Sequence, residues 1–180
     1  MKNRLKNILN LISEEIDKKL IDCRFILSIS GGLDSMSLLN ILNDYNLNFI
    51  TIHFNHKINS QSDKIAEFVK NQIILLTKSK HFTINLQLEY EKNFESYARF
   101  KRYFHLENLR RRTEFDFILT AHHLDDQIET LHMKKVQNTH WSNSIGIREA
   151  YKNIRRPFLT VYKNDIRNYA IQKKILWIDD

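Results

Sequence analysis

The segment Ile26-Leu27-Ser28-Ile29-Ser30-Gly31-Gly32-Leu33-Asp34-Ser35-Met36-Ser37 decides the fold of this chain. It begins within an apolar run, residues 25–29, which predicts a buried strand. After the run, apolar residues at helical spacing predict a helix that reaches about residue 45. The chain holds only three glycines, and two of them are adjacent at this junction. Adjacent glycines here indicate a turn that needs positive φ or a close approach of the backbone to a ligand.

A strand–turn–helix junction of this kind is suited to binding phosphate. Successive amide N–H groups in the turn point into one concavity, and the dipole of the following helix adds partial positive charge. The junction lacks both the Walker A pattern and the third glycine of a dinucleotide fingerprint. A simple capped turn would account for Asp34 and Ser35, but not for the paired glycines. We therefore predict a phosphate-binding turn made of Ser30, Gly31, Gly32, Leu33, Asp34 and Ser35.

Composition limits the class of protein. The chain has 180 residues, of which 42% are hydrophobic, enough for one sizeable domain spanning residues 1–180. No apolar run has membrane-spanning length, and the amino terminus does not resemble a signal peptide. Cys23 is the only cysteine, so we expect a reduced, cytoplasmic protein in which this thiol is structural. The net charge of +7 favours a polyanionic partner.

Periodicity along the rest of the chain predicts strands that alternate with helices. Further strands are expected at 49–54, 82–88 and 115–120, and helices at 4–20, 62–76, 95–112, about 125–136 and roughly 161–174. Residues 137–153 are expected to be irregular, and 155–159 to form a short edge segment. This order predicts an α/β fold, a three-layer Rossmann-like domain around a parallel sheet. In such folds ligands bind beyond the carboxyl ends of the strands.

Polar residues follow three of the predicted strands at that edge. Beside the glycine turn, His53-Phe54-Asn55-His56 ends the second strand, and His122-His123-Leu124-Asp125-Asp126 follows the fourth. These groups converge on one site if strands one, two and four are neighbours. Asp125 and Glu129 are one helical turn apart and can share a face. Capping of a helix start would explain one or two of these acids, but not the whole cluster.

The acidic cluster has two chemical interpretations. Beside a phosphate-binding turn, Asp34 and one of Asp125 or Asp126, with Asp126 preferred, would hold Mg²⁺ that bridges phosphate oxygens. Alternatively, a metal-dependent phosphohydrolase would use His122, His123, Asp125 and Asp126. That reading leaves the glycine turn unexplained.

The motifs together resemble a known family. Ser-Gly-Gly-x-Asp-Ser at residues 30–35 is similar to the pyrophosphate (PP) loop of the ATP-pyrophosphatases. Combined with residues 121–130, it resembles the tRNA(Ile)-lysidine synthetases. Residues 53–56, 93–103, 156–159 and 166–180 resemble further motifs of that family in the same order. The resemblance therefore covers nearly the whole chain.

This resemblance implies a two-step ligation. ATP adenylates the C2 oxygen of the wobble cytidine in tRNA(Ile) with a CAU anticodon, and L-lysine then displaces AMP to give lysidine. The implied cofactors are ATP and Mg²⁺. Arg99 and Arg102 would neutralise phosphate charge. The turn would bind the nucleotide together with His53, Asn55, His56 and His122. Lysine binding and proton transfer would fall to His123, Asp125, Asp126 and Glu129.

The sequence departs from the family pattern in two places. Residues 134–141 replace a leucine-rich, glycine-containing stretch, and the sequence stops at Asp180, where members continue into tRNA-recognition domains. The resemblance thus implies the N-terminal catalytic domain alone. A tRNA thiolase is an alternative, although such enzymes usually carry cysteine pairs or an iron–sulfur cluster. A nucleotide- or RNA-binding remnant without turnover is another.

Overall fold

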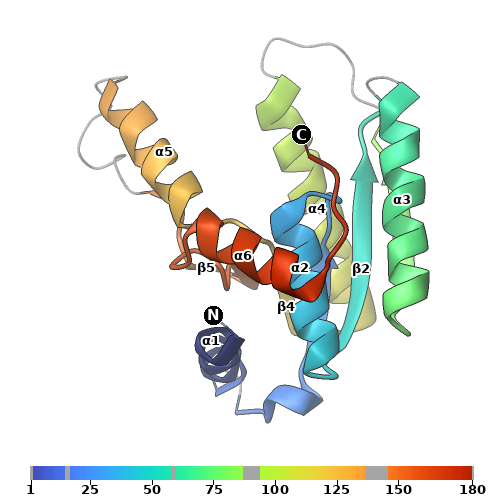
Figure 1. Ribbon diagram of the computed structural model, residues 1–180, viewed down its shortest axis with the longest axis vertical. Helices are drawn as coiled ribbons and strands as arrows, with labels where there is room; N and C mark the ends of the chain where they lie inside the picture. The colour runs from blue at the N-terminus through green and yellow to red at the C-terminus, as the bar shows by residue number, and fades with distance from the viewer. Residues whose placement is uncertain (1, 15–16, 58–59, 87–93, 137–145, 180) are drawn as a thin grey trace.

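The computed structural model describes residues 2–14, 17–57, 60–86, 94–136 and 146–179 (Figure 1). Its helices are α1 (Lys2–Glu14), α2 (Leu33–Asp44), α3 (Ser60–Leu76), α4 (Phe94–Thr113), α5 (Leu124–Val136) and α6 (Lys163–Lys173), with a short 3₁₀ helix η1 (Leu20–Asp22). Its strands are β1 (Arg24–Ser28), β2 (Asn48–Asn55), β3 (His81–Asn85), β4 (Phe117–Leu119), β5 (Ala150–Tyr151) and β6 (Ile154–Arg155).

The described strands form one sheet in the order β3-β2-β1-β4-β6-β5. β1 lies between β2 and β4 and pairs with both in parallel, so that Leu27 is opposite Thr51 on one side and Leu119 on the other. Strands one, two and four are therefore neighbours, as the convergence of the polar groups requires. The predicted α/β Rossmann-like fold is confirmed.

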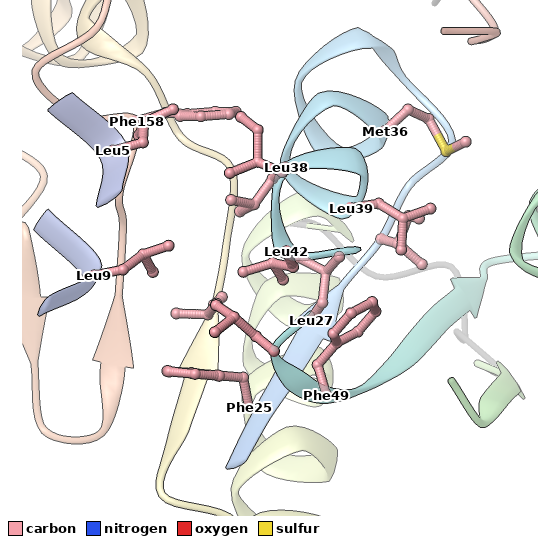
Figure 2. Packing of buried hydrophobic residues seen from close by; sticks show 14 of the residues in the cluster. Leu5, Leu9, Phe25, Leu27, Met36, Leu38, Leu39, Leu42, Phe49 and Phe158 are labelled. Atoms are coloured by element: carbon pink, nitrogen blue, oxygen red, sulfur yellow. The ribbon is translucent and has the colours of Figure 1, made fainter. Parts of the chain in front are cut away.

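Helices cover both faces of the sheet, which gives the expected three layers. Phe25, Leu27 and Phe49 pack on α1 and α2 in the larger core, to which α3 and α6 also contribute (Figure 2). Ile26 points to the opposite face and packs in a smaller core with Leu106 of α4. This alternation along β1 is the expected pattern for a strand that is buried on both faces.

Some boundaries differ from the prediction. The first helix ends at Glu14 rather than near residue 20, and Asp17 has a positive φ of 53° that a helix cannot accommodate. At the other end, residues 150–155 form an antiparallel hairpin of β5 and β6, because Lys152 adopts a positive φ of 52° in the turn. The prediction of a loop or irregular stretch was thus wrong at residues 150–151, which form β5, and its residues 137–145 lie outside the described part of the chain. Residues 87–88 of the predicted third strand also lie outside it.

Helix α5 extends away from the body of the molecule (Figure 1). No described residue of this helix is buried, in contrast to α2 and α6. Only its amino-terminal end approaches the edge of the sheet where the polar residues gather. Among the described helices, none combines the length and the hydropathy that a membrane span requires.

Candidate functional site

A cavity of about 810 Å³ opens at the carboxyl ends of β1, β2 and β4. It brings together residues that the sequence analysis placed in three separate motifs. The predicted site residues that line it are Ser30, Gly32, Leu33, Asp34, Ser35, His53, Asn55, His56, Arg99, Arg102, His122 and Asp126. The remaining predicted residues, Gly31, His123, Asp125 and Glu129, are not part of its lining.

The two glycines of the turn have different surroundings. Gly31 is buried and has a φ of +98°, and a Cβ built on it would lie 2.9 Å from Cγ2 of Val69 in α3. Gly32 has an ordinary φ of −75° and faces the cavity, where a Cβ would meet only Ser30 Oγ at 3.5 Å and the Ile178 carbonyl at 3.9 Å. Gly31 therefore allows the chain to turn against α3, whereas nothing in the protein itself requires glycine at position 32.

Serine hydroxyls hold the turn in shape. The amides of Ser30 and Gly31 both donate to Ser35 Oγ at 3.2 Å, and Ser35 Oγ donates to the Gly32 carbonyl at 3.1 Å. The Gly32 amide donates to Ser30 Oγ at 3.3 Å. These hydroxyls accept hydrogen bonds from the amides that were predicted to face phosphate. A bound phosphate would therefore have to replace the hydroxyls as acceptor or contact the hydroxyls directly. A further bond, from the Ile178 amide to the Gly31 carbonyl at 3.0 Å, joins the turn to the segment after α6.

His123 connects the turn to the acidic cluster. Its Nε2 lies 3.6 Å from Asp34 Oδ2 and 3.5 Å from Asp126 Oδ1. Its ring orientation is set by α5, because the Asp126 amide donates to His123 Nδ1 at 3.3 Å and the His123 amide donates to Asp126 Oδ2 at 2.8 Å. With Nδ1 accepting, a neutral ring carries its proton on Nε2, where it points toward the two carboxylates.

Asp34 is a carboxylate held in a partly desolvated position. Burial raises its pKa above the ordinary value, against the opposing effects of His123 and Lys163, and the nearby Asp126 raises it further. Its Oδ1 atom is buried and has no hydrogen-bond partner among the described residues. An unpartnered carboxylate oxygen beside a second carboxylate is a position that favours a cation.

The histidines that line the cavity do not supply its positive charge. Burial lowers the pKa of His122 to about 4, with Arg156 adding to the effect, and its Nδ1 lies 3.0 Å from Thr120 Oγ1. Burial also lowers the pKa of His53 and of His56. These rings are therefore neutral at neutral pH, and the positive charge comes from Arg and Lys side chains.

Four basic residues line the cavity from two helices: Arg99 and Arg102 of α4, and Lys163 and Arg167 of α6. Burial lowers the pKa of Arg102, and its Nε is buried with no hydrogen-bond partner among the described residues. Lys163 and Arg167 were not among the predicted site residues. Their spacing of four residues, which puts both on one helical face, was the available signal.

Two predicted nucleotide ligands make structural contacts as well as lining the cavity. Asn55 donates to Asp63 Oδ1 at 2.7 Å and accepts from the Lys57 amide at 2.9 Å. His53 Nδ1 lies 3.0 Å from the Ile29 carbonyl. These contacts join the ends of β1, β2 and α3 and leave only part of each side chain available to a ligand.

Asp125 and Glu129 are exposed on α5, outside the cavity lining. Asp125 instead accepts a hydrogen bond from the Lys163 amide at 2.7 Å, at the first residue of α6. A carboxylate at this position caps the helix and complements its dipole.

Replacing Asp125 with Ala is therefore expected to lower the free energy of unfolding by about 1 kcal/mol, because the amino terminus of α6 loses its cap. Asp125→Asn retains an acceptor oxygen and should lose less. Urea denaturation of both variants measures the difference. Equal stability of Asp125→Ala and the parent chain would contradict a capping role.

The donor set suits a metal ion that is shared with a ligand. Among the described residues, no group of three or more His, Cys, Asp and Glu side chains is arranged to hold a metal alone. Mg²⁺ is commonly bound by one or two carboxylates together with substrate phosphates. Asp34 and Asp126, both lining the cavity and both beside His123, fit that arrangement.

Sequence comparison relates the chain to enzymes of tRNA modification. The tRNA(Ile)-lysidine synthase of Aster yellows witches'-broom phytoplasma is 34% identical over 169 residues, which cover 87% of this chain and 36% of that protein. The tRNA(Ile)-lysidine synthase of Actinobacillus pleuropneumoniae serotype 3 is 32% identical over 161 residues, covering 87% of this chain and 38% of the relative. The chain thus spans less than half the length of these curated relatives.

Structure comparison agrees on the fold. The U34-tRNA thiolase NcsA from Methanococcus maripaludis superposes with a TM-score of 0.70 at 16% identity, covering 99% of this chain and 66% of that one. The NH3-dependent NAD synthetase from Campylobacter jejuni gives a TM-score of 0.66 at 14% identity, covering 96% of this chain and 73% of that one. The family profile of the PP-loop domain matches residues 2–180. With the glycine turn and the cavity in the positions described, the chain belongs to the PP-loop domain family.

Proposed function

We propose that this domain carries out the ATP-dependent formation of lysidine in tRNA(Ile) with a CAU anticodon, in the cytoplasm. The observation that carries the proposal is the shared cavity, which is lined by the glycine turn, by Asp126 and by two arginines of α4, with His123 Nε2 at 3.6 Å from Asp34 behind that lining. The similarity to tRNA(Ile)-lysidine synthases over most of the chain supports the choice of substrate.

In the first step, the C2 oxygen of the cytidine attacks the α-phosphorus of ATP. The bond from that phosphorus to the bridging oxygen breaks, and pyrophosphate leaves. Arg99 and Arg102, which line the cavity, are our candidates to neutralise charge on the phosphates, and Lys163 and Arg167 would add positive charge from α6. The turn and the start of α2 position the nucleotide.

Mg²⁺, when bound by Asp34 and Asp126, would supply positive charge to the phosphate oxygens. Independently of the metal, the Nε2–H of His123 can offset the repulsion between these two carboxylates, because Nε2 lies 3.6 Å from Asp34 and 3.5 Å from Asp126. Its own orientation is fixed by the start of α5.

In the second step, the uncharged ε-amine of lysine attacks C2 of the adenylated cytidine, the C2–oxygen bond breaks, and AMP leaves. The attacking nitrogen must lose protons. His123 and Asp126 are our candidates to accept one, and Asp126 and Glu129 our candidates to bind the lysine. Asp125 is the weaker candidate, because its carboxylate already accepts from α6.

A metal-dependent phosphohydrolase fits the cavity less well. His122 has a pKa lowered to about 4 by burial and is hydrogen bonded to Thr120. Such an enzyme also has no need of a glycine turn, whereas that turn forms one wall of the cavity.

Pyrophosphate exchange tests the proposal. With Mg²⁺, the chain is expected to exchange labelled pyrophosphate into ATP only when tRNA(Ile) with a CAU anticodon is present, and to release AMP only when lysine is added. The same tRNA with a CAC anticodon is the control. Nucleotide binding without exchange would contradict the proposal and favour a binding domain.

A further inference from the structure

A second depression lies between α4 and the β5–β6 hairpin, with a volume of about 610 Å³. It is separate from the glycine turn, but Arg99 and Tyr103 line both cavities. A ligand that extends out of the first cavity can therefore continue into the second. We call this second depression the α4 groove.

Aromatic rings are exposed in the α4 groove. Phe100 and Phe104, one helical turn apart on α4, are 63% and 53% exposed. Their ring centroids are 6.2 Å apart, and their planes are inclined by 26°. Across the groove, Tyr151 of β5 is 46% exposed. Exposed phenylalanines gathered in one depression indicate a binding surface, since each ring leaves a large apolar area in water.

Positive charge surrounds these rings. Arg148 and Lys152 lie over the Tyr151 ring, at 6.0 Å and 5.7 Å from its centroid. Arg111 lines the groove from α4, and the acid beside it, Glu107, is already paired with Arg110 at 2.9 Å and with Arg111 at 3.0 Å. The groove therefore combines flat apolar rings with an excess of cations.

We propose that the α4 groove binds unpaired nucleotides of an RNA, beside the nucleotide whose base enters the main cavity. The proposal rests on the proposed function, because it assigns a place to the RNA substrate of that reaction. Bases stack on aromatic side chains and phosphates pair with Arg and Lys, which together are the usual means of binding single strands. In a duplex the bases are already stacked, so the rings would find no face to contact.

The test compares three variants in RNA binding. Phe100→Ala and Phe104→Ala change exposed side chains, so folding should survive, and each is expected to weaken binding of a CAU anticodon stem-loop about tenfold by fluorescence anisotropy. Phe82→Ala is the matched control, because this ring is 46% exposed on β3, outside the groove. A blunt RNA duplex should bind equally weakly to all of these proteins.

Binding of ATP to the same variants separates the two proposals. Unchanged ATP affinity with weaker stem-loop binding in both groove variants supports the groove. Equal stem-loop affinity in the parent chain and both groove variants overturns the proposal that the α4 groove binds RNA and leaves the proposed function standing. The same outcome is expected if an apolar protein segment occupies the groove. If the parent chain binds ATP but no RNA, the groove and the tRNA substrate are both wrong.

Discussion

Asp34→Asn is expected to lower pyrophosphate exchange about 100-fold to 1000-fold while raising the stability of the metal-free protein. Activity falls because one carboxylate that would hold Mg²⁺ against the phosphates is lost. Stability rises because the carboxylate has a buried oxygen without a partner, and burial already raises its pKa, so ionisation there opposes folding. Exchange kinetics and thermal denaturation with a chelator measure the two effects.

Asp22→Asn is the control for this prediction. Asp22 is exposed in η1, outside the cavity, and the same change there should leave both exchange and stability close to those of the parent chain. A lower melting temperature for Asp34→Asn would show that the carboxylate supports the fold instead of opposing it. Normal exchange would remove Asp34 from the reaction.

The two glycines of the turn should differ in how far a single added methyl group changes the stability of the protein. Gly31→Ala is expected to lower the free energy of unfolding by about 2–4 kcal/mol, since it forces an L-residue to φ +98° and brings Cβ to 2.9 Å from Val69. Gly32→Ala should leave stability within about 1 kcal/mol, because its φ of −75° is ordinary and the nearest atoms are 3.5 Å away or more.

Nucleotide affinity separates these variants further. The methyl group of Gly32→Ala would project toward the cavity, so ATP binding by calorimetry should weaken at least about tenfold although the protein remains folded. Each glycine variant thus serves as the control of the other. If Gly32→Ala binds ATP normally, the backbone at this position makes no close approach to the nucleotide.

Much of the fold followed from local pattern. The apolar run at 25–29 gave β1, and the alternation of strands and helices gave the three layers, because burial on both faces leaves a strong signal. The hairpin at 150–155 was missed since each of its strands has only two residues, too few to show alternation. The end of α1 was missed because its apolar spacing continues beyond Glu14, where backbone geometry at Asp17 ends the helix.

The candidate site was predicted in its position but not in its details. The motifs of Asp34 and Asp126 each follow a parallel strand, and this was enough to predict that the two carboxylates lie near each other. It could not show that Asp125 turns toward α6, because that contact depends on the packing of a helix distant in sequence. The same packing brings Lys163 into the cavity.

The bond between the Ile178 amide and the Gly31 carbonyl has a consequence for folding. The nucleotide cavity takes part of its wall from the segment that follows α6, including Ile178 and Asp179. A partly folded intermediate that holds β1 and α2 but lacks this segment would have an incomplete pocket. We therefore expect ATP binding only after β1 and α2 have come together with residues 178–179, which are distant from them in the sequence.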